Sequence, residues 1–128
     1  MAIAVENTDI LKFLFSDILG MSFKDKEHVE SEGVNVLKIY AEDDNTAIEL
    51  LEPASDSSKM KKFLKNKGEG LHHIALTVDN ISNAIEFMNE NNIKLVYDKP
   101  QKGSDNTLIT FIHPKSSPGI LIELCQKS

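Results

Sequence analysis

The order of apolar and polar positions divides the chain into two halves of similar pattern. In each half a short strand pattern is followed by a helical pattern and then by three further strand patterns, judged by the period of the apolar residues. The expected strands lie at residues 1–5, 21–29, 33–41 and 45–51, and at 72–78, 93–97, 107–113 and 119–126. The helical patterns comprise Ile10, Leu11, Leu14, Phe15 and Ile18, and Ile81, Ala84, Ile85 and Met88. A further short helix is expected at 57–66, with Ser57 or Ser58 as its N-cap and Gly68 or Gly70 beyond its end.

The two halves also share sequence at a nearly constant offset. Residues 1–7 (MAIAVEN) resemble residues 74–80 (IALTVDN), and residues 47–52 (AIELLE) resemble residues 121–126 (LIELCQ). The offsets are 73 and 74, so two separate segments agree on the repeat length to within one residue. We therefore predict an α+β fold in which one domain, 1–128, contains two βαβββ modules, with internal repeats at about 1–52 and 72–126.

Length and composition fit a folded intracellular domain. The chain has 128 residues, of which 41% are hydrophobic, and this is enough for a packed core. We find no apolar run of the roughly 20 residues that a membrane span needs, and the start MAIAVENTD lacks the features of a secretory signal. A single cysteine, Cys125, cannot form an internal disulfide, which favours the reducing cytoplasm. We expect no membrane partner.

The charge balance narrows the choice of ligands. There are 14 basic and 20 acidic residues, a net charge of -6, which disfavours broad binding of nucleic acid. All the basic residues are lysines, so no arginine is present to hold a carboxylate or phosphate in a planar bidentate contact. Anions must then be bound by lysines, backbone N–H groups or a metal ion.

Three of the expected strands combine an apolar face with a second face that carries one ionisable residue, because strand side chains alternate between faces. The apolar faces, suited to packing under helices, consist of Ile48 and Leu50, of Ile74, Leu76 and Val78, and of Ile122 and Leu124. The ionisable residues on the opposite faces are Glu49, His73 and Glu123. A carboxylate in such surroundings is costly unless a cation or proton compensates it.

The repeat places these ionisable residues at matching positions. Glu49 and Glu123 are equivalent, and the counterpart of His73 would stand one residue before Met1. Imidazole and carboxylate together suit divalent Mn, Fe, Co, Ni or Zn, so the pattern indicates a metal site. Each residue also has a plainer interpretation, in which the glutamates lie on a solvated face and His73 is a hydrogen-bonded structural histidine.

Other polar residues have weaker functional interpretations. His72 and His113 suit structural or supporting roles, and His28 suits the surface. Cys125 has no base at a recognisable spacing, so core packing is favoured over nucleophilic catalysis. The lysines of 59–67 fit a solvated helix face, with an anchor for an anionic substrate tail as the alternative; they are Lys59, Lys61, Lys62, Lys65 and Lys67.

Several motifs resemble those of the vicinal oxygen chelate superfamily, which includes glyoxalases, bleomycin resistance proteins and dioxygenases. The matching stretches are AIAV, FSDILGM, IELLEP, KFLKNKGEGLHHIALTVDNI and FIHPKSSPGILIEL, and they span nearly the whole chain. Within the superfamily, IELLEP, the GEGLHHIAL segment and the HPKS ending resemble the methylmalonyl-CoA epimerase family, with the glyoxalase I group next. The resemblance implies a glyoxalase-like cupped mixed sheet, an acyl-CoA substrate and a homodimer.

The resemblance also implies roles for individual residues. It places metal ligands on Glu49, His73 and Glu123, and it favours cobalt, with Mn, Ni or Zn as alternatives. A fourth family ligand, a histidine just before AIAV, has no counterpart in the sequence. Glu123 would be one catalytic proton carrier, and Glu32 or Glu30 the second, because Ser31 stands where the family carries an acid. We take Lys115 as the substrate-binding candidate, with the lysines of 59–67 as an alternative.

The implied reaction is interconversion of (R)- and (S)-methylmalonyl-CoA. It requires removal of the C2 proton from one face and return of a proton to the other, through an enolate that a metal ion stabilises. One alternative is a lactoylglutathione lyase, which would use a similar site on a hemithioacetal. Another is a superfamily module that binds a small molecule without chemistry, to which the missing histidine would point.

Overall fold

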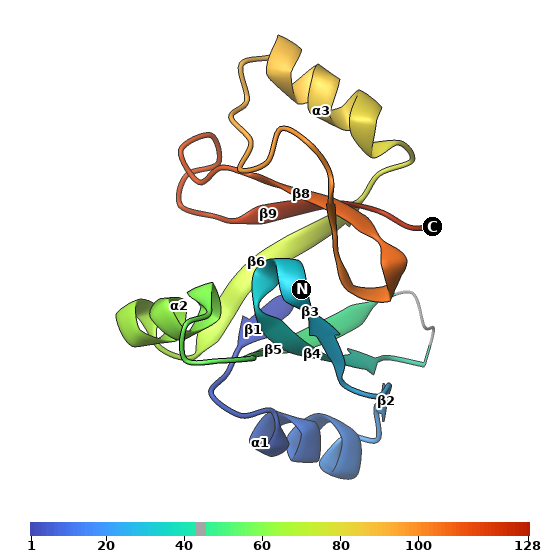
Figure 1. The fold of residues 1–128 in the computed structure, drawn as a ribbon. Helices are drawn as coiled ribbons and strands as arrows, with labels where there is room; N and C mark the ends of the chain where they lie inside the picture. The colour runs from blue at the N-terminus through green and yellow to red at the C-terminus, as the bar shows by residue number, and fades with distance from the viewer. Residues whose placement is uncertain (43–45) are drawn as a thin grey trace. The chain divides into compact units, whose positions relative to one another are not determined.

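The computed structural model describes residues 1–42 and 46–128, which form two compact units, Met1–His72 and His73–Ser128. Each unit contains a mixed β-sheet, and a helix covers one face of that sheet, α1 in the first unit and α3 in the second (Figure 1). The predicted α+β fold of two βαβββ modules is confirmed. None of the helices formed by these residues is long and apolar enough to cross a membrane.

The first unit has strand order β2-β4-β5-β1, with β3 also paired to β4. Strands β1 and β5 are parallel, and the other pairs are antiparallel. Its elements are β1 (Ala2–Ala4), α1 (Asp9–Lys12), the π-helix η1 (Phe13–Ile18), β2 (Ser22–Phe23), β3 (Glu27–Val29), the 3-10 turn η2 (Glu30–Glu32), β4 (Val34–Tyr40), β5 (Ala47–Pro53) and α2 (Lys59–Lys67). Residue 45, which the sequence assigned to a strand, lies outside the described residues.

The second unit has strand order β6-β9-β8-β7, with β6 and β9 parallel. Its elements are β6 (Gly70–Thr77), whose first residues belong to the first unit, α3 (Ile81–Glu90), β7 (Gln101–Lys102), the 3-10 turn η3 (Ser104–Asn106), β8 (Leu108–Ile112) and β9 (Ile122–Gln126). The core of this unit gathers Ile81 and Ile85 of α3 with Leu95, and Val78, Met88, Leu108 and Ile112 pack against them.

In both units a strand side chain accepts a hydrogen bond from the backbone at the start of a helix. In the first, Glu52 Oε2 accepts a hydrogen bond from the Thr8 N–H at 3.2 Å, at the N-cap of α1. In the second, Gln126 Oε1 accepts one from the Ile81 N–H at 2.8 Å, at the first residue of α3. Because a helix start leaves N–H groups without helical partners, each side chain satisfies a donor and fixes its helix to the sheet.

The helix at 57–66 is confirmed as α2, which begins two residues later and ends one residue later. Ser58 is its N-cap and accepts a hydrogen bond from the Lys61 N–H at 3.2 Å. Met60 and Leu64 are buried against β-strand residues such as Leu51 and Val36.

The first predicted helix differs from expectation because its second part is π-helical. Leu11 and Phe15 pack against the apolar face of the sheet that includes Leu50. Ile18, at the end of the wider π turns, lies off that face and is exposed by 60%, and Ile10, in the α-helical part before them, is exposed by 80%.

The strand predicted at 21–29 is interrupted. Strand β2 places Phe23 opposite Ile39, whereas β3 places Glu27 opposite Val36, so one extra residue lies between the two registers. This insertion is a β-bulge, and it divides the predicted strand into two short ones.

The strand predicted at 93–97 is wrong, because only Leu95 forms a bridge there, opposite Ile112. Hydrogen bonds join Val96 N–H to Phe111 O and His113 N–H to Lys94 O, both at 2.8 Å. The pairing does not extend further toward Pro100, which has no N–H to donate.

The apolar face predicted for 72–78 is also wrong in part. Only Val78 packs against the cluster around α3, while Ile74 and Leu76 are exposed by 40% and 52%. The reason is that α3 packs on β8 and β9, and of this face only Val78, just after β6, reaches the cluster around α3.

Candidate metal and proton-transfer site

The second unit brings His73 and Glu123 together on one face of its sheet. Ala75 lies opposite Glu123 in the parallel β6–β9 pair, and His73 shares the face of Ala75 because it is two residues away. His73 Nε2 lies 3.1 Å from Glu123 Oε2, with side chains 5% and 14% exposed. This is the face that strand alternation predicts for both residues.

An aromatic side chain supports the pair. Phe111 lies opposite Glu123 across β8–β9, and its ring meets that of His73 edge to face, with centroids 5.6 Å apart and an interplanar angle of 81°. Edge-to-face contact fixes the imidazole plane through packing rather than charge. His73 therefore has a defined orientation toward Glu123.

The first unit places Glu49 in the equivalent register. Ala2 lies opposite Glu49 in the parallel β1–β5 pair, as Ala75 does opposite Glu123. On its other side Glu49 faces Lys38, with Lys38 Nζ 3.5 Å from Glu49 Oε1. Lys38 is a residue that the sequence reasoning missed. Its signal was present, since Val34, Val36 and Lys38 alternate along one strand and a lysine interrupts the apolar face.

The donor set fits a divalent ion. Metal–ligand distances of about 2.0–2.2 Å put neighbouring donor atoms about 3 Å apart, and His73 Nε2 and Glu123 Oε2 are separated by 3.1 Å. Imidazole with carboxylate is a donor combination that suits Mn, Fe, Co, Ni and Zn. Within neither unit do three or more His, Cys, Asp or Glu side chains gather to hold a metal ion, among residues 1–42 and 46–128.

The two candidates for a second proton carrier differ in exposure. Glu30 and Glu32 lie in the 3-10 turn η2 between β3 and β4, where Glu30 is exposed and Glu32 is half-buried. The turn ends at Gly33, whose φ of 63° is left-handed and whose added Cβ would lie 3.0 Å from the Ser58 side chain. The glycine therefore permits the turn that carries both acids.

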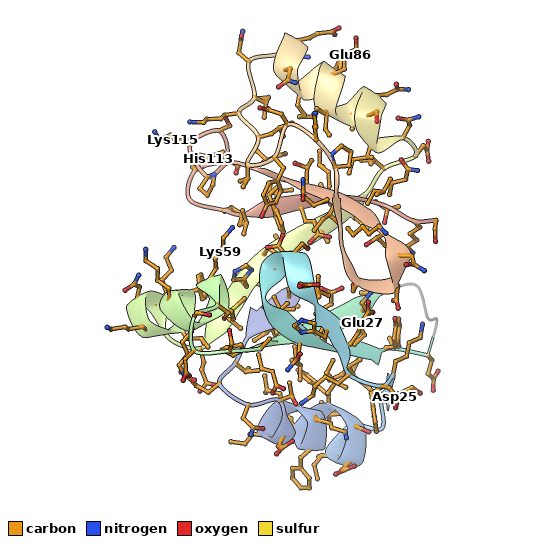
Figure 2. All side chains as sticks on the ribbon, viewed as in Figure 1. Asp25, Glu27, Lys59, Glu86, His113 and Lys115 are labelled. Atoms are coloured by element: carbon orange, nitrogen blue, oxygen red, sulfur yellow. The ribbon has the colours of Figure 1, made fainter. Side chains whose placement is uncertain are left out.

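Lys115 lies on the loop between β8 and β9, next to His113 (Figure 2). The Lys115 N–H donates to His113 Nδ1 at 3.1 Å, so a neutral His113 carries its hydrogen on Nε2. The Lys94 N–H donates to Ser116 Oγ at 2.9 Å, which ties the same loop to the segment before β7. The loop is thus ordered by its own hydrogen bonds while the Lys115 side chain is exposed.

The remaining sequence candidates take structural positions. His72 packs its ring edge on against Phe63 of α2 at 4.6 Å. His28 is exposed, with Nδ1 3.1 Å from Asn35 Oδ1. Cys125 is half-buried on β9. The lysines of α2 are exposed, as expected for a solvated helix face, and Figure 2 shows Lys59 at the start of that helix.

Sequence comparison defines the class of protein. The profile of the Glyoxalase/Bleomycin resistance protein/Dioxygenase superfamily matches residues 1–111. The chain therefore belongs to this superfamily, as the motifs predicted.

Within the superfamily the chain is similar to methylmalonyl-CoA epimerases. The mitochondrial methylmalonyl-CoA epimerase of Dictyostelium discoideum is 34% identical over 128 residues, which cover 99% of this chain and 76% of that protein. The structure of methylmalonyl-CoA epimerase from Mycobacterium tuberculosis has a TM-score of 0.93 at 30% identity, covering 99% of this chain and 85% of that one. A variant of the Streptomyces coelicolor epimerase in complex with 2-nitronate-propionyl-CoA has a TM-score of 0.89 at 29% identity, covering 99% and 94%. The glyoxalase-like fold and the expectation of an isomerase are thereby confirmed.

Proposed function

We propose that the chain is a metal-dependent epimerase that interconverts (R)- and (S)-methylmalonyl-CoA. The observation that carries this proposal is the His73–Glu123 pair, at 3.1 Å on one face of the second sheet, in a chain similar to epimerases that act on this thioester. The geometry offers a carboxylate for proton transfer beside an imidazole that suits a metal ion. The carboxylate would serve proton transfer at the acidic carbon, and a metal ion held by the imidazole would stabilise the resulting enolate.

Glu49 of the first unit is proposed to hold the metal together with His73 and Glu123. The support is the shared register of the two glutamates, each flanked by an alanine of a parallel strand. When bound, a divalent ion such as Co²⁺ would supply positive charge that stabilises the enolate developed on the substrate. With no arginine in the chain, that charge also serves the substrate carboxylate.

The proton transfers are assigned to two carboxylates. C2 of methylmalonyl-CoA lies between a thioester and a carboxylate, so its hydrogen is acidic, and inversion needs a base on each face. Glu123 Oε2 lies beside His73, so we assign the transfer on one face to Glu123 Oε1. Glu32, the half-buried acid of η2, is proposed for the other face.

Two further features complete the proposal. Lys115, exposed on the β8–β9 loop, is proposed to meet a phosphate of the CoA moiety. A homodimer is proposed as well, and an exposed apolar surface on and after α1 supports it, since such surfaces mark interaction sites; it comprises Ile10, Phe13, Leu14, Ile18 and Leu19. Sedimentation equilibrium would measure the mass in solution, and a monomer at all concentrations would refute the dimer.

The reaction itself is tested by solvent exchange. Purified protein supplied with Co²⁺ should incorporate deuterium at C2 of methylmalonyl-CoA in deuterated water and racemise a single epimer. If C2 carries no deuterium even with many molar equivalents of enzyme, the chain is not an epimerase of this substrate. Product from methylglyoxal and glutathione would instead identify a lactoylglutathione lyase, and activity on neither substrate, without metal binding, would identify a binding module.

A further inference from the structure

Lys38 occupies an unusual position for a lysine. Its side chain is 13% exposed, and its Nζ lies 3.5 Å from Glu49 Oε1, whose side chain is 23% exposed. Lys12 is the other half-buried lysine, and its ammonium lies 4.2 Å from the centre of the Phe23 ring; the remaining lysines are exposed. A lysine withdrawn from water is costly unless a charge pairs with it. Lys38 has that charge in a residue proposed to bind metal.

The second unit of the repeat has an aromatic residue at the position of Lys38. In the second unit the residue opposite the equivalent glutamate is Phe111, which is buried and packs against His73. In the first unit the next pair along β4 and β5 on the face of Lys38 is apolar, since Val36 lies opposite Leu51. A cation directly opposite the glutamate is therefore specific to the first unit.

We propose that Lys38 is a positioning residue for Glu49, which offsets the charge of that carboxylate and so sets the balance between metal affinity and catalysis. This inference rests on the proposed function, in which Glu49 is a metal ligand. An ammonium beside a carboxylate repels a divalent ion and competes with it for the carboxylate oxygens. It therefore weakens metal binding. It also leaves the loaded site more positive toward the carboxylate and the enolate of the substrate, which favours turnover.

Two other charged groups lie on the same face as Lys38, so the experiment must show that Lys38 acts through Glu49. Glu27 of β3 lies opposite Val36 and so shares this face, two residues along β4 from Lys38. Lys24 lies on the same side, with its ammonium 5.0 Å from the centre of the Tyr40 ring. The test therefore includes a variant at Glu49 itself, to show that Lys38 acts through that carboxylate.

The first test compares Lys38→Met with Lys26→Met. Methionine has similar length without charge, and Lys26 pairs with a different glutamate of β5, Glu52, at 2.7 Å. Calorimetric titration of metal-free protein with Mn²⁺ or Co²⁺ should show Lys38→Met binding about tenfold more tightly, because a repulsive charge is removed. Its kcat/KM for methylmalonyl-CoA should fall about tenfold, on the same electrostatic scale. Lys26→Met should change neither by more than about twofold, since exposed pairs contribute little.

The opposite directions distinguish positioning from a structural role. Loss of packing or folding would lower affinity and turnover together, and an incidental contact would leave both unchanged; either result would overturn the proposal. Lys38→Arg keeps the charge and should match the unmodified chain in both measurements. If Lys38→Met does not fold, Lys38→Phe, which copies Phe111, takes its place with the same expected directions.

The second test is a double-mutant cycle with Glu49→Gln, which keeps an oxygen donor and removes the charge. The effect of Lys38→Met on metal affinity should shrink in the Glu49→Gln background, because the competition for the carboxylate is gone and only direct repulsion of the ion remains. An equal effect in both backgrounds would show that Lys38 does not act through Glu49. If the unmodified chain neither binds metal nor epimerises the substrate, the proposed function fails; if it does both and Lys38→Met leaves them unchanged, only the role of Lys38 fails.

Discussion

Lys38 and Phe111 occupy equivalent positions in the two units, each directly opposite a glutamate of the adjacent antiparallel strand. Lys38 faces Glu49, and Phe111 faces Glu123. The repeat has thus kept the glutamate while changing its neighbour from an aromatic ring to a cation. In the second unit the ring orients His73 by edge-to-face packing, whereas in the first a charge holds the carboxylate. The same backbone register therefore supports two different ways of positioning a carboxylate.

If Glu32 is the second proton carrier, its loss should stop epimerisation while exchange of the C2 hydrogen with solvent continues. Glu32→Gln removes a base from one face of C2, so epimerisation should fall by at least about a hundredfold. Exchange of the C2 hydrogen of one epimer, served by the other face, should persist. Mass spectrometry and chiral analysis of the same sample measure both quantities.

Glu30→Gln is the matched control, because Glu30 lies in the same 3-10 turn and is exposed. It should epimerise at nearly the unmodified rate. If the losses are reversed between the two variants, Glu30 is the carrier and the assignment of Glu32 is wrong.

Glu123→Gln should impair both metal binding and catalysis. Glutamine keeps the shape of the side chain but removes its charge and basicity, so the rate should fall by at least about a hundredfold. Metal affinity should fall in parallel, since one anionic donor becomes neutral. Steady-state assays and calorimetry measure the two effects. Activity and metal content that both survive the substitution would mean that Glu123 is an ordinary strand residue.

Removing the hydrogen bond between Gln126 and the start of α3 should lower stability without affecting catalysis. Gln126→Leu removes the acceptor for the Ile81 N–H at the start of α3. Unfolding free energy should fall by about 1 kcal/mol, the usual loss on removing a helix cap, as measured by urea denaturation. Gln126→Glu keeps an acceptor and should retain most of the stability. Equal losses in the two variants would show that the hydrogen bond contributes nothing.

Much of the fold could be predicted because the sequence repeats itself and because strand alternation is a local pattern that neighbouring residues reveal. Alternation placed His73 and Glu123 on one face, and their contact at 3.1 Å follows from the parallel register of β6 and β9. The N-cap of α2 could be narrowed to Ser57 or Ser58 because a cap depends on a few adjacent residues, and the structure has Ser58.

The features that could not be predicted depend on tertiary packing. The exposure of Ile74 and Leu76 follows from where α3 lies, which no period in β6 encodes. The π turns after Lys12 and the bulge between β2 and β3 are shifts of one residue in hydrogen bonding, to which apolar spacing is insensitive. Lys38 breaks the apolar alternation of its strand in the sequence, but its significance lies in a partner on the next strand, which the sequence does not pair with it.

The register of β1 yields a prediction about a fourth metal ligand. Ala2 lies opposite Glu49 as Ala75 lies opposite Glu123, so the residue equivalent to His73 would stand immediately before Met1. Adding one histidine there should tighten Co²⁺ or Mn²⁺ binding by about tenfold or more relative to an added alanine. Residues that only support metal ligands contribute about tenfold or more to metal affinity, and a direct ligand should contribute at least as much. Calorimetric titration of the two extended chains measures the difference directly, and the alanine chain controls for the extra residue. Equal affinities would mean that this position does not face the metal, and that the proposed equivalence of the two units ends at Ala2.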